Sequence, residues 1–206
     1  MKNTTKLFLG LTAMVSLAFI KPNIAEPKQI HVVIDAAHGG SDFGATSNGI
    51  TEKQIVEQIT HKIYALNKNK NAVIHLTRSS DVTVTLNDRT KIINELKPDL
   101  VLSLHVNANV FKHKSGMEMY VSKESKTYEK ANTIAEKLNA KLAKSNNLKT
   151  TEIKNANFFM LKKSEVPAVI IELGYITNES DRKQLTEDQE QDKIAATIVE
   201  FISELE

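Results

Sequence analysis

The sequence predicts a single α/β domain with a mostly parallel, mixed central sheet flanked by helices, and three observations carry that prediction. Short β-branched runs such as Val32–Ile34 and Val169–Ile171 have no polar alternation, which is typical of strands covered on both faces. Segments with helical apolar spacing separate these runs along the chain. A length of 206 residues with 41% hydrophobic residues fits one substantial core. We therefore expect one layered domain over residues 28–206.

Composition and charge exclude several classes of function. The net charge of +2 comes from 27 basic and 25 acidic residues that are interspersed along the chain, so no nucleic-acid partner is predicted. The chain has no cysteine, which excludes disulfides, thiolate catalysis and thiolate zinc sites together. Any bound metal would therefore be held by histidine, aspartate or glutamate.

The amino terminus has the form of a signal peptide. Lys2 and Lys6 precede an apolar run from Leu7 to Ile20 that is too short to span a bilayer comfortably. A small residue at Ala25 offers a cleavage point, which predicts a signal peptide over residues 1–25 and no membrane span in the mature form. A retained membrane anchor is the alternative, because Asn23 fits the small-residue pattern imperfectly. Either way we expect an exported protein, in the periplasm or in the cell wall outside the cell.

The first half of the mature chain alternates between strands and helices. Val32–Ile34 predicts a buried strand, and a helix is expected to begin near Thr51, a suitable cap. The apolar residues of that helix share one face: Ile55, Ile59, Ile63 and Leu66. A second strand follows at Asn71–Arg78, then a helix at Asp88–Leu96 and a third strand at Pro98–Asn107.

The second half continues the alternation less regularly. Gly116–Ser122 predicts a strand, Phe158–Lys163 a short strand, and Val166–Ile171 a buried strand, while Asn178 is expected to cap a helix. A long helix between the first two strands has one apolar face: Ala131, Ile134, Leu138 and Leu142. The last helix has another: Ile194, Ile198, Phe201, Ile202 and Leu205.

Three reactive side chains follow buried strands of this predicted sheet. His38, His105 and Glu172 each lie just past the carboxyl end of a strand, and ligands of open α/β sheets bind at that edge. Glu52 reaches the same region from the start of the first helix, where the helix dipole stabilises its ionised form. Two imidazoles and a carboxylate form a three-ligand set suited to catalytic zinc, with a fourth position for water.

Each of these residues also has an ordinary structural interpretation. Taken alone, Glu172 is better explained as a glutamate at a strand end that reaches solvent or a neighbouring cation. His38 and His105, each taken alone, are better explained as ordinary loop and strand-end histidines. Their spacing is too long for a local metal signature, so the prediction rests on their placement. The other four histidines are assigned no chemistry: His31, His61, His75 and His113.

Five motifs in order resemble those of a known family. They are DAAHGGSDFGA (Asp35–Ala45), GITEK (Gly49–Lys53), LTRSSD (Leu76–Asp81), SLHVNA (Ser103–Ala108) and PAVIIELGYITN (Pro167–Asn178). Together they look like the motifs of the zinc-dependent N-acetylmuramoyl-L-alanine amidases of the amidase_3 type. The resemblance covers essentially everything after the predicted signal peptide.

The resemblance implies a site and a reaction. His38, Glu52 and His105 would hold one Zn²⁺ per chain, and Glu172 would be the catalytic carboxylate. The substrate would be peptidoglycan, cut at the amide between N-acetylmuramic acid and L-alanine of the stem peptide. A dication held by two neutral imidazoles and one carboxylate lowers the pKa of bound water toward about 7. Glu172 would then take the proton of that water and return it to the departing amine.

A few positions leave alternatives open. Ala37 stands where the family usually has glycine, so its backbone must avoid a positive φ. Arg78, Asp81 and Arg89 match family positions, but for them a structural ion pair is at least as plausible as substrate contact. Asn107 is equally suited to substrate contact and to a hydrogen bond that ends the loop.

Two other classes of function share these features. A catalytically inactive regulator of the same fold would bind cell wall without cutting it, although such a protein would be expected to lose a ligand or the catalytic carboxylate. A zinc peptidase acting within the stem peptide would use the same chemistry. Some family members carry an inserted helix over the zinc, but the chain before Pro167 is too short for one. We therefore expect an open site that requires no protein activator.

Overall fold

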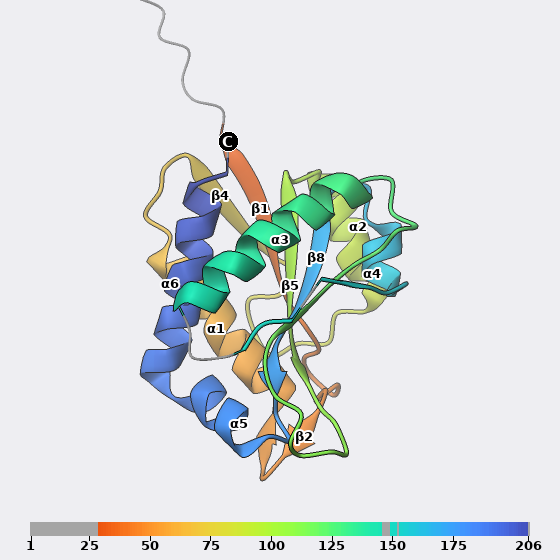
Figure 1. Cartoon of the computed structure of the whole chain (residues 1–206). Coiled ribbons are helices and arrows are strands. Elements are labelled where there is room, and N and C mark those ends of the chain that lie inside the picture. Colours follow the sequence, from red (N-terminus) through yellow and green to blue (C-terminus); the bar gives the residue numbers. More distant parts are fainter. Residues whose placement is uncertain (1–28, 146–148, 152, 206) are drawn as a thin grey trace, which may run out of the picture.

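The computed structural model describes residues 29–145, 149–151 and 153–205, and its centre is a six-stranded sheet (Figure 1). The strands of this sheet are β1 (Ile30–Ala36), β4 (Ala72–Leu76), β5 (Leu100–Asn107), β6 (Glu118–Val121), β7 (Lys154–Asn155) and β8 (Ala168–Tyr175). Their order is β4-β1-β5-β8-β6-β7, and only the β6–β8 pair is antiparallel. The predicted mixed, mostly parallel α/β domain is therefore confirmed. The predicted signal peptide lies outside the described residues.

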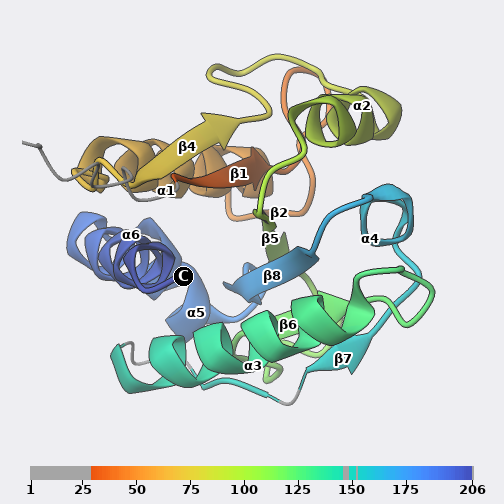
Figure 2. The same ribbon diagram turned by 90° about the horizontal axis from the view of Figure 1, so that it is seen from above.

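Helices cover both faces of the sheet (Figure 2). They are α1 (Glu52–Leu66), α2 (Leu86–Leu96), α3 (Tyr128–Ser145), α4 (Phe159–Lys163), α5 (Glu179–Thr186) and α6 (Asp188–Ser203). Along β1, Val32 and Ile34 pack into the core that α1, α3 and α6 share, whereas Val33 packs into a smaller core with residues of α2 and α4. Because successive side chains of a strand point to opposite faces, an unbroken apolar run requires this double cover.

Two helices begin where the sequence predicts a cap. The hydroxyl of Thr51 accepts a hydrogen bond from the N–H of Gln54, and the Oε1 atom of Gln54 accepts one from the backbone N–H of Thr51. Asn178 caps α5 in the same way, by accepting from the N–H of Asp181. Leu66 was expected on the buried face of α1 but is 42% exposed, at the last position of the helix.

The predicted strand at Phe158–Lys163 is wrong, because this segment forms the one-turn helix α4. Met160 and Leu161 are both buried against Val101 and Ile170. Neighbouring residues of a strand point in opposite directions, so only a helical turn brings both side chains onto one face of the sheet. The short strands β2 (Thr46–Ser47), β3 (Ile50–Thr51) and β7 were not predicted either.

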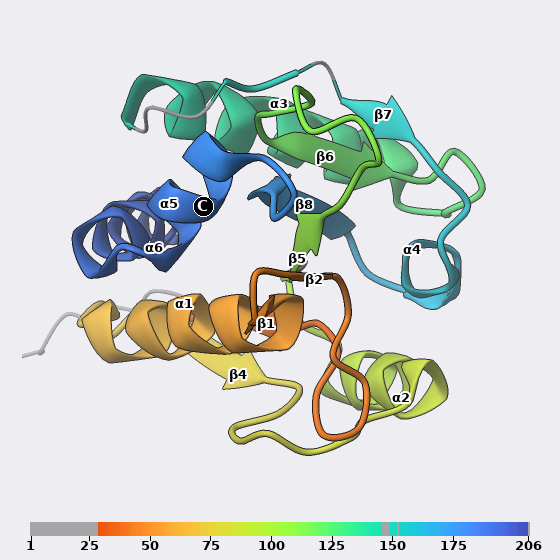
Figure 3. The ribbon, with the colours of Figure 1, turned by 90° about the horizontal axis from the view of Figure 1, so that it is seen from below.

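The carboxyl and amino ends of the parallel strands carry different features. Seen from below (Figure 3), the chain around β2 crosses the edge at which the parallel strands end, beside β5. His105 and Glu172 pair in register near this edge, but inside β5 and β8 rather than past their ends, because both strands continue to Asn107 and Tyr175. At the opposite edge Ile30 and Leu205 line one hollow, so the first and last described segments lie together there.

None of the helices in the described part of the chain combines the length and the apolar composition that a membrane span requires.

Candidate metal centre

The loop after β1 presents His38 in a left-handed backbone conformation. His38 has a φ of 59°, and the next two residues, Gly39 and Gly40, also have positive φ. Ala37 is buried and does not adopt this conformation, so alanine is tolerated where the family usually has glycine. A Cβ on Gly39 would lie 2.3 Å from the carbonyl oxygen of Val82, which explains why the turn needs glycine there.

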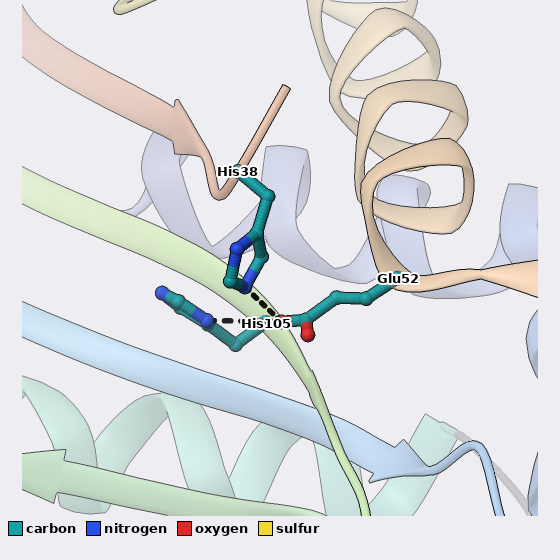
Figure 4. Close-up of side chains that lie close together, drawn as sticks. All are labelled: His38, Glu52 and His105. Carbon is teal, nitrogen blue, oxygen red and sulfur yellow. Dashed lines mark hydrogen bonds and ion pairs between the residues drawn. The ribbon is translucent and has the colours of Figure 1, made fainter. Parts of the chain in front are cut away.

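His38, Glu52 and His105 converge on one point (Figure 4). The Nε2 atom of His38 and the Nδ1 atom of His105 each lie 3.0 Å from the Oε1 atom of Glu52. One candidate ligand atom from each residue lies within 4.8 Å of the other two. The loop after β1, the first turn of α1 and strand β5 therefore bring two imidazoles and a carboxylate together, as the placement of these residues predicts.

Glu52 is fixed by the backbone of its neighbours. Its Oε2 accepts the N–H of Ala45 at 2.8 Å and its Oε1 the N–H of Val106 at 3.0 Å. Burial alone would raise the pKa of Glu52, but hydrogen bonds from His105, His38 and the Ala45 amide hold that pKa well below its ordinary value. The carboxylate is thus ionised and aimed, which is the condition for a metal ligand.

The second nitrogen of His38 has a partner that sequence reasoning missed. Its Nδ1 lies 2.8 Å from Oδ2 of Asp42, and the N–H of Gly44 donates to the other oxygen of Asp42. Burial alone would lower the pKa of His38, but Glu52 and Asp42 outweigh it and raise this pKa to about 9 in the metal-free protein. Asp42 therefore orients the ring so that Nε2 faces the site.

Glu172 adds a second carboxylate to the same cavity. A cavity of about 560 Å³ is lined by Glu172 together with His38, Glu52 and His105. The Oε2 atom of Glu172 is buried without a hydrogen-bond partner among the described residues. Burial is the main reason that the pKa of Glu172 rises to about 7. A buried carboxyl group that can gain or lose a proton near neutrality has the properties of a general base or acid.

Glu118 is a further buried carboxylate that sequence reasoning missed. It pairs opposite Glu172 across β6 and β8, and it accepts hydrogen bonds from the hydroxyls of Tyr120 and Tyr175. Burial alone would raise the pKa of Glu118, but an ion pair with Lys154 and these hydroxyls lower it. Unlike Glu172, Glu118 is therefore fully partnered.

The contacts of Asn107 bear on its two predicted roles, a hydrogen bond that ends the loop and substrate contact. Its side-chain oxygen accepts the N–H of Ala108 at 2.8 Å, and its Nδ2 lies 3.4 Å from Oε2 of Glu118. Asn107 also lines the cavity. The loop-end hydrogen bond is present, and substrate contact stays a prediction.

Arg78 and Arg89 hold the backbone that carries His38. The guanidinium of Arg78 is buried and donates to the carbonyl oxygens of Ala36 and Ala37 at 3.0 and 3.1 Å. Arg89 lies 2.5 Å from Oδ1 of the buried Asp35. These contacts favour the structural alternative for both arginines over substrate contact.

Comparison with known proteins places the chain in a family. A model of the Amidase_3 family, described as N-acetylmuramoyl-L-alanine amidase, matches residues 32–204. The amidase LytC of Bacillus subtilis is 34% identical over 81% of this chain and 34% of LytC. The protein YqiI of Bacillus subtilis is 35% identical over 83% of this chain and 82% of YqiI. The probable cell wall amidase LytH of Staphylococcus saprophyticus is 34% identical over 87% of this chain, which spans only 59% of LytH.

Solved structures agree with the sequence relatives. An N-acetylmuramoyl-L-alanine amidase from Clostridium difficile 630 superimposes with a TM-score of 0.81 at 27% identity, over 85% of this chain and 96% of that one. The CwlD amidase of Clostridioides difficile, in complex with the GerS lipoprotein, superimposes with a TM-score of 0.76 at 26% identity, over 85% of this chain and 97% of the CwlD chain. With matching sequence motifs, fold and clustered side chains, the chain belongs to the Amidase_3 family of N-acetylmuramoyl-L-alanine amidases.

Proposed function

We propose that this protein is an exported, zinc-dependent peptidoglycan hydrolase that cleaves the amide between N-acetylmuramic acid and L-alanine of the stem peptide. The observation that carries the proposal is the buried, unpartnered oxygen of Glu172 in the cavity that also contains His38, Glu52 and His105. The family and the names of the relatives supply the substrate class.

The residues present fit a zinc ion. His38 through Nε2, His105 through Nδ1 and Glu52 through its carboxylate would hold it, and this two-histidine, one-glutamate set is typical of catalytic zinc. When bound, the ion supplies Lewis-acid chemistry, which polarises a carbonyl and makes water more acidic. The amides of Ala45 and Val106 keep Glu52 in place for this role.

Glu172 would move the proton of the reaction. Its carboxylate takes a proton from the attacking water, whose oxygen bonds to the lactyl carbonyl carbon. The same carboxyl then gives that proton to the nitrogen of L-alanine as the C–N bond breaks. Burial raises the pKa of Glu172 to about 7 in the metal-free protein, and a carboxyl group that titrates near neutrality is suited to both transfers.

Digestion of purified peptidoglycan tests the proposal. Mass spectrometry of digested sacculi should detect free amino groups on L-alanine and unsubstituted lactyl carboxyl groups on muramic acid. New ends within the stem peptide would identify the stem-peptide peptidase instead. Binding to sacculi without any new end would identify the inactive wall-binding regulator.

Export is a separate part of the proposal. Amino-terminal sequencing of the native protein should give a mature chain that begins near Glu26. A full-length protein recovered from the cytosol would refute it.

Activity should require no protein activator. Helix α4 borders the cavity with Phe158, Phe159 and Met160 but leaves His38 and His105 partly exposed, with side chains 22% and 25% accessible. The purified, zinc-loaded protein should therefore digest sacculi alone. If it cuts only after a partner is added, this part of the proposal fails; the CwlD complex with GerS makes a lipoprotein the partner to try first.

A further inference from the structure

Part of the cavity lining is an apolar wall. Val84 and Leu86 come from the start of α2, and Phe158, Phe159 and Met160 from the start of α4. Leu86 is 55% exposed, Phe158 44% and Phe159 37%. Large apolar side chains that stay exposed beside a reaction centre indicate a surface that a ligand covers.

This wall offers no free cation to a ligand. The described residues that line the cavity include one basic side chain, that of Arg89. The N–H groups of its guanidinium already donate hydrogen bonds within the protein. They contact the carboxylate of Asp35 and the carbonyl oxygens of Ala36, Val84 and His38. Within the described part of the cavity lining, a carboxylate of a ligand would therefore find no unused lysine or arginine to pair with.

The same cavity carries three carboxyl groups besides that of the buried Asp35. Glu52 is a proposed metal ligand, Glu172 is the proposed base, and Asp42, 59% exposed at its side chain, pairs with the ring of His38. The amino end of α2 does not compensate, because Thr85 and Asp88 already cap it and Asp88 brings its own negative charge. Helix α4 is one turn long, so its dipole adds little.

We propose that this apolar wall receives the first two residues of the stem peptide and selects a second residue that carries a carboxamide, D-isoglutamine, over one that carries a carboxylate, D-isoglutamate. The inference rests on the proposed function. The methyl groups of the lactyl unit and of L-alanine flank the scissile amide, and they match an aliphatic and aromatic surface. A carboxylate next to them would be desolvated beside like charges without a counter-ion, whereas a carboxamide needs only hydrogen bonds.

Two soluble wall fragments test the selection. Disaccharide tripeptides that differ only in this carboxamide or carboxylate are digested separately by the zinc-loaded protein, and kcat/KM is measured for each. We expect the carboxamide fragment to be cut at least about tenfold more efficiently, because unscreened like charges within several ångströms repel strongly in a partly buried site. The ratio should shrink as salt is added, since salt screens the repulsion.

A charge placed in the wall gives a second test. Leu86→Lys adds a cation at the exposed start of α2, so it should raise kcat/KM for the carboxylate fragment and narrow the ratio at least about threefold. Leu96→Lys is the matched control, because Leu96 is 43% exposed at the other end of the same helix and does not line the cavity. It should leave the ratio unchanged.

The outcomes separate the two proposals. A protein that frees L-alanine amino ends from sacculi but cuts both fragments equally, prefers the carboxylate or cuts neither overturns the selection and leaves the proposed function standing. An equal change of the ratio in both lysine variants also overturns it, because the effect would then come from net charge. No new ends on sacculi or fragments overturns both proposals.

Discussion

Two carboxyl groups on strands of the same sheet, those of Asp35 and Glu172, have opposite surroundings. Asp35 on β1 is fully buried and accepts hydrogen bonds from Thr77 and Ser103 at 2.6 Å, besides its ion pair with Arg89. Burial alone would raise its pKa, but Arg89 and the two hydroxyls lower it. Glu172 on β8 has a buried oxygen with no such partner, and its pKa is raised.

The difference in hydrogen-bond partners distinguishes a carboxylate that stabilises the fold from one suited to proton transfer. Three donors, from Thr77, Ser103 and Arg89, keep Asp35 ionised and tie it to neighbouring elements of the fold. A carboxyl group that lacks partners costs free energy on folding, and such strain is typical of residues kept for chemistry. The two residues should therefore respond differently to substitution and to pH.

The largest effect is expected at the proposed zinc ligands. His38→Ala or His105→Ala removes one of three ligands, so bound zinc and amide cleavage should both be lost, because two ligands hold zinc poorly against competing chelators. Zinc is measured by elemental analysis after dialysis. His61→Ala, an exposed histidine outside the cavity, is the control and should keep its zinc. A His38 variant with a full complement of zinc would remove that residue from the ligand set.

The next effect is expected at Glu172. Glu172→Gln keeps the size of the side chain and removes the ionisable oxygen, so turnover should fall by roughly 10² to 10⁴ while zinc and folding survive. Glu95→Gln, 68% exposed at its side chain, should keep normal turnover. If Glu172→Gln turns over at the wild-type rate, or loses its zinc, Glu172 has another role.

Asp35 should show the reverse behaviour. Asp35→Asn leaves the Arg89 guanidinium buried without its counter-ion, so the free energy of unfolding should fall by about 3–5 kcal/mol. Urea unfolding of the metal-free protein measures it. Asp188→Asn, in an exposed pair with Lys62, should cost far less. A variant of Asp35 that is stable but inactive would place this residue in the chemistry.

The smallest effect is a difference in pH dependence. With its pKa raised from 4.5 to about 7, folded Glu172 holds a proton that the unfolded chain releases. The free energy of unfolding of the metal-free protein should therefore fall between pH 4.5 and 7, by roughly 3 kcal/mol at most, and Glu172→Gln should lack this component.

Asp35 acts in the opposite direction, because its lowered pKa contributes stability that is lost only as pH falls below the ordinary range of aspartate. If the free energy of unfolding of the metal-free protein changes equally with pH above pH 4.5 in the wild type and in Glu172→Gln, the contrast between Glu172 and Asp35 is wrong.

Much of the fold follows from local patterns, and the failures have physical causes. Unbroken apolar runs predict β1, β5 and β8, because burial on both faces requires them. The run Phe158–Lys163 is too short to distinguish a strand from a helix, and contacts with Val101 and Ile170 decided the matter. The two-residue strands β2, β3 and β7 depend on pairing with distant segments, which local sequence does not encode.

The site was predictable where position along the sheet decides it. His38, His105 and Glu172 are found by asking which buried strands carry a reactive side chain at or near the carboxyl end. Asp42 was missed, although its spacing of four residues from His38 was a usable signal. Glu118 was also missed, since alternation with Met117 and Met119 suggests a residue on the open face of a strand. Only tertiary contacts with Tyr120 and Tyr175 reveal that it is buried and partnered.

The position of the two chain ends has a consequence for how the domain can be attached to other structures. Ile30 and Leu205 lie together at the edge opposite the cavity, one strand length away, which is about 20 Å for β1. A tether at either end would therefore attach to the edge of the sheet opposite the cavity and leave the opening of the cavity facing away from the attachment point. An anchor, a purification tag or a wall-binding module can therefore be joined to either end without blocking the path of a glycan strand.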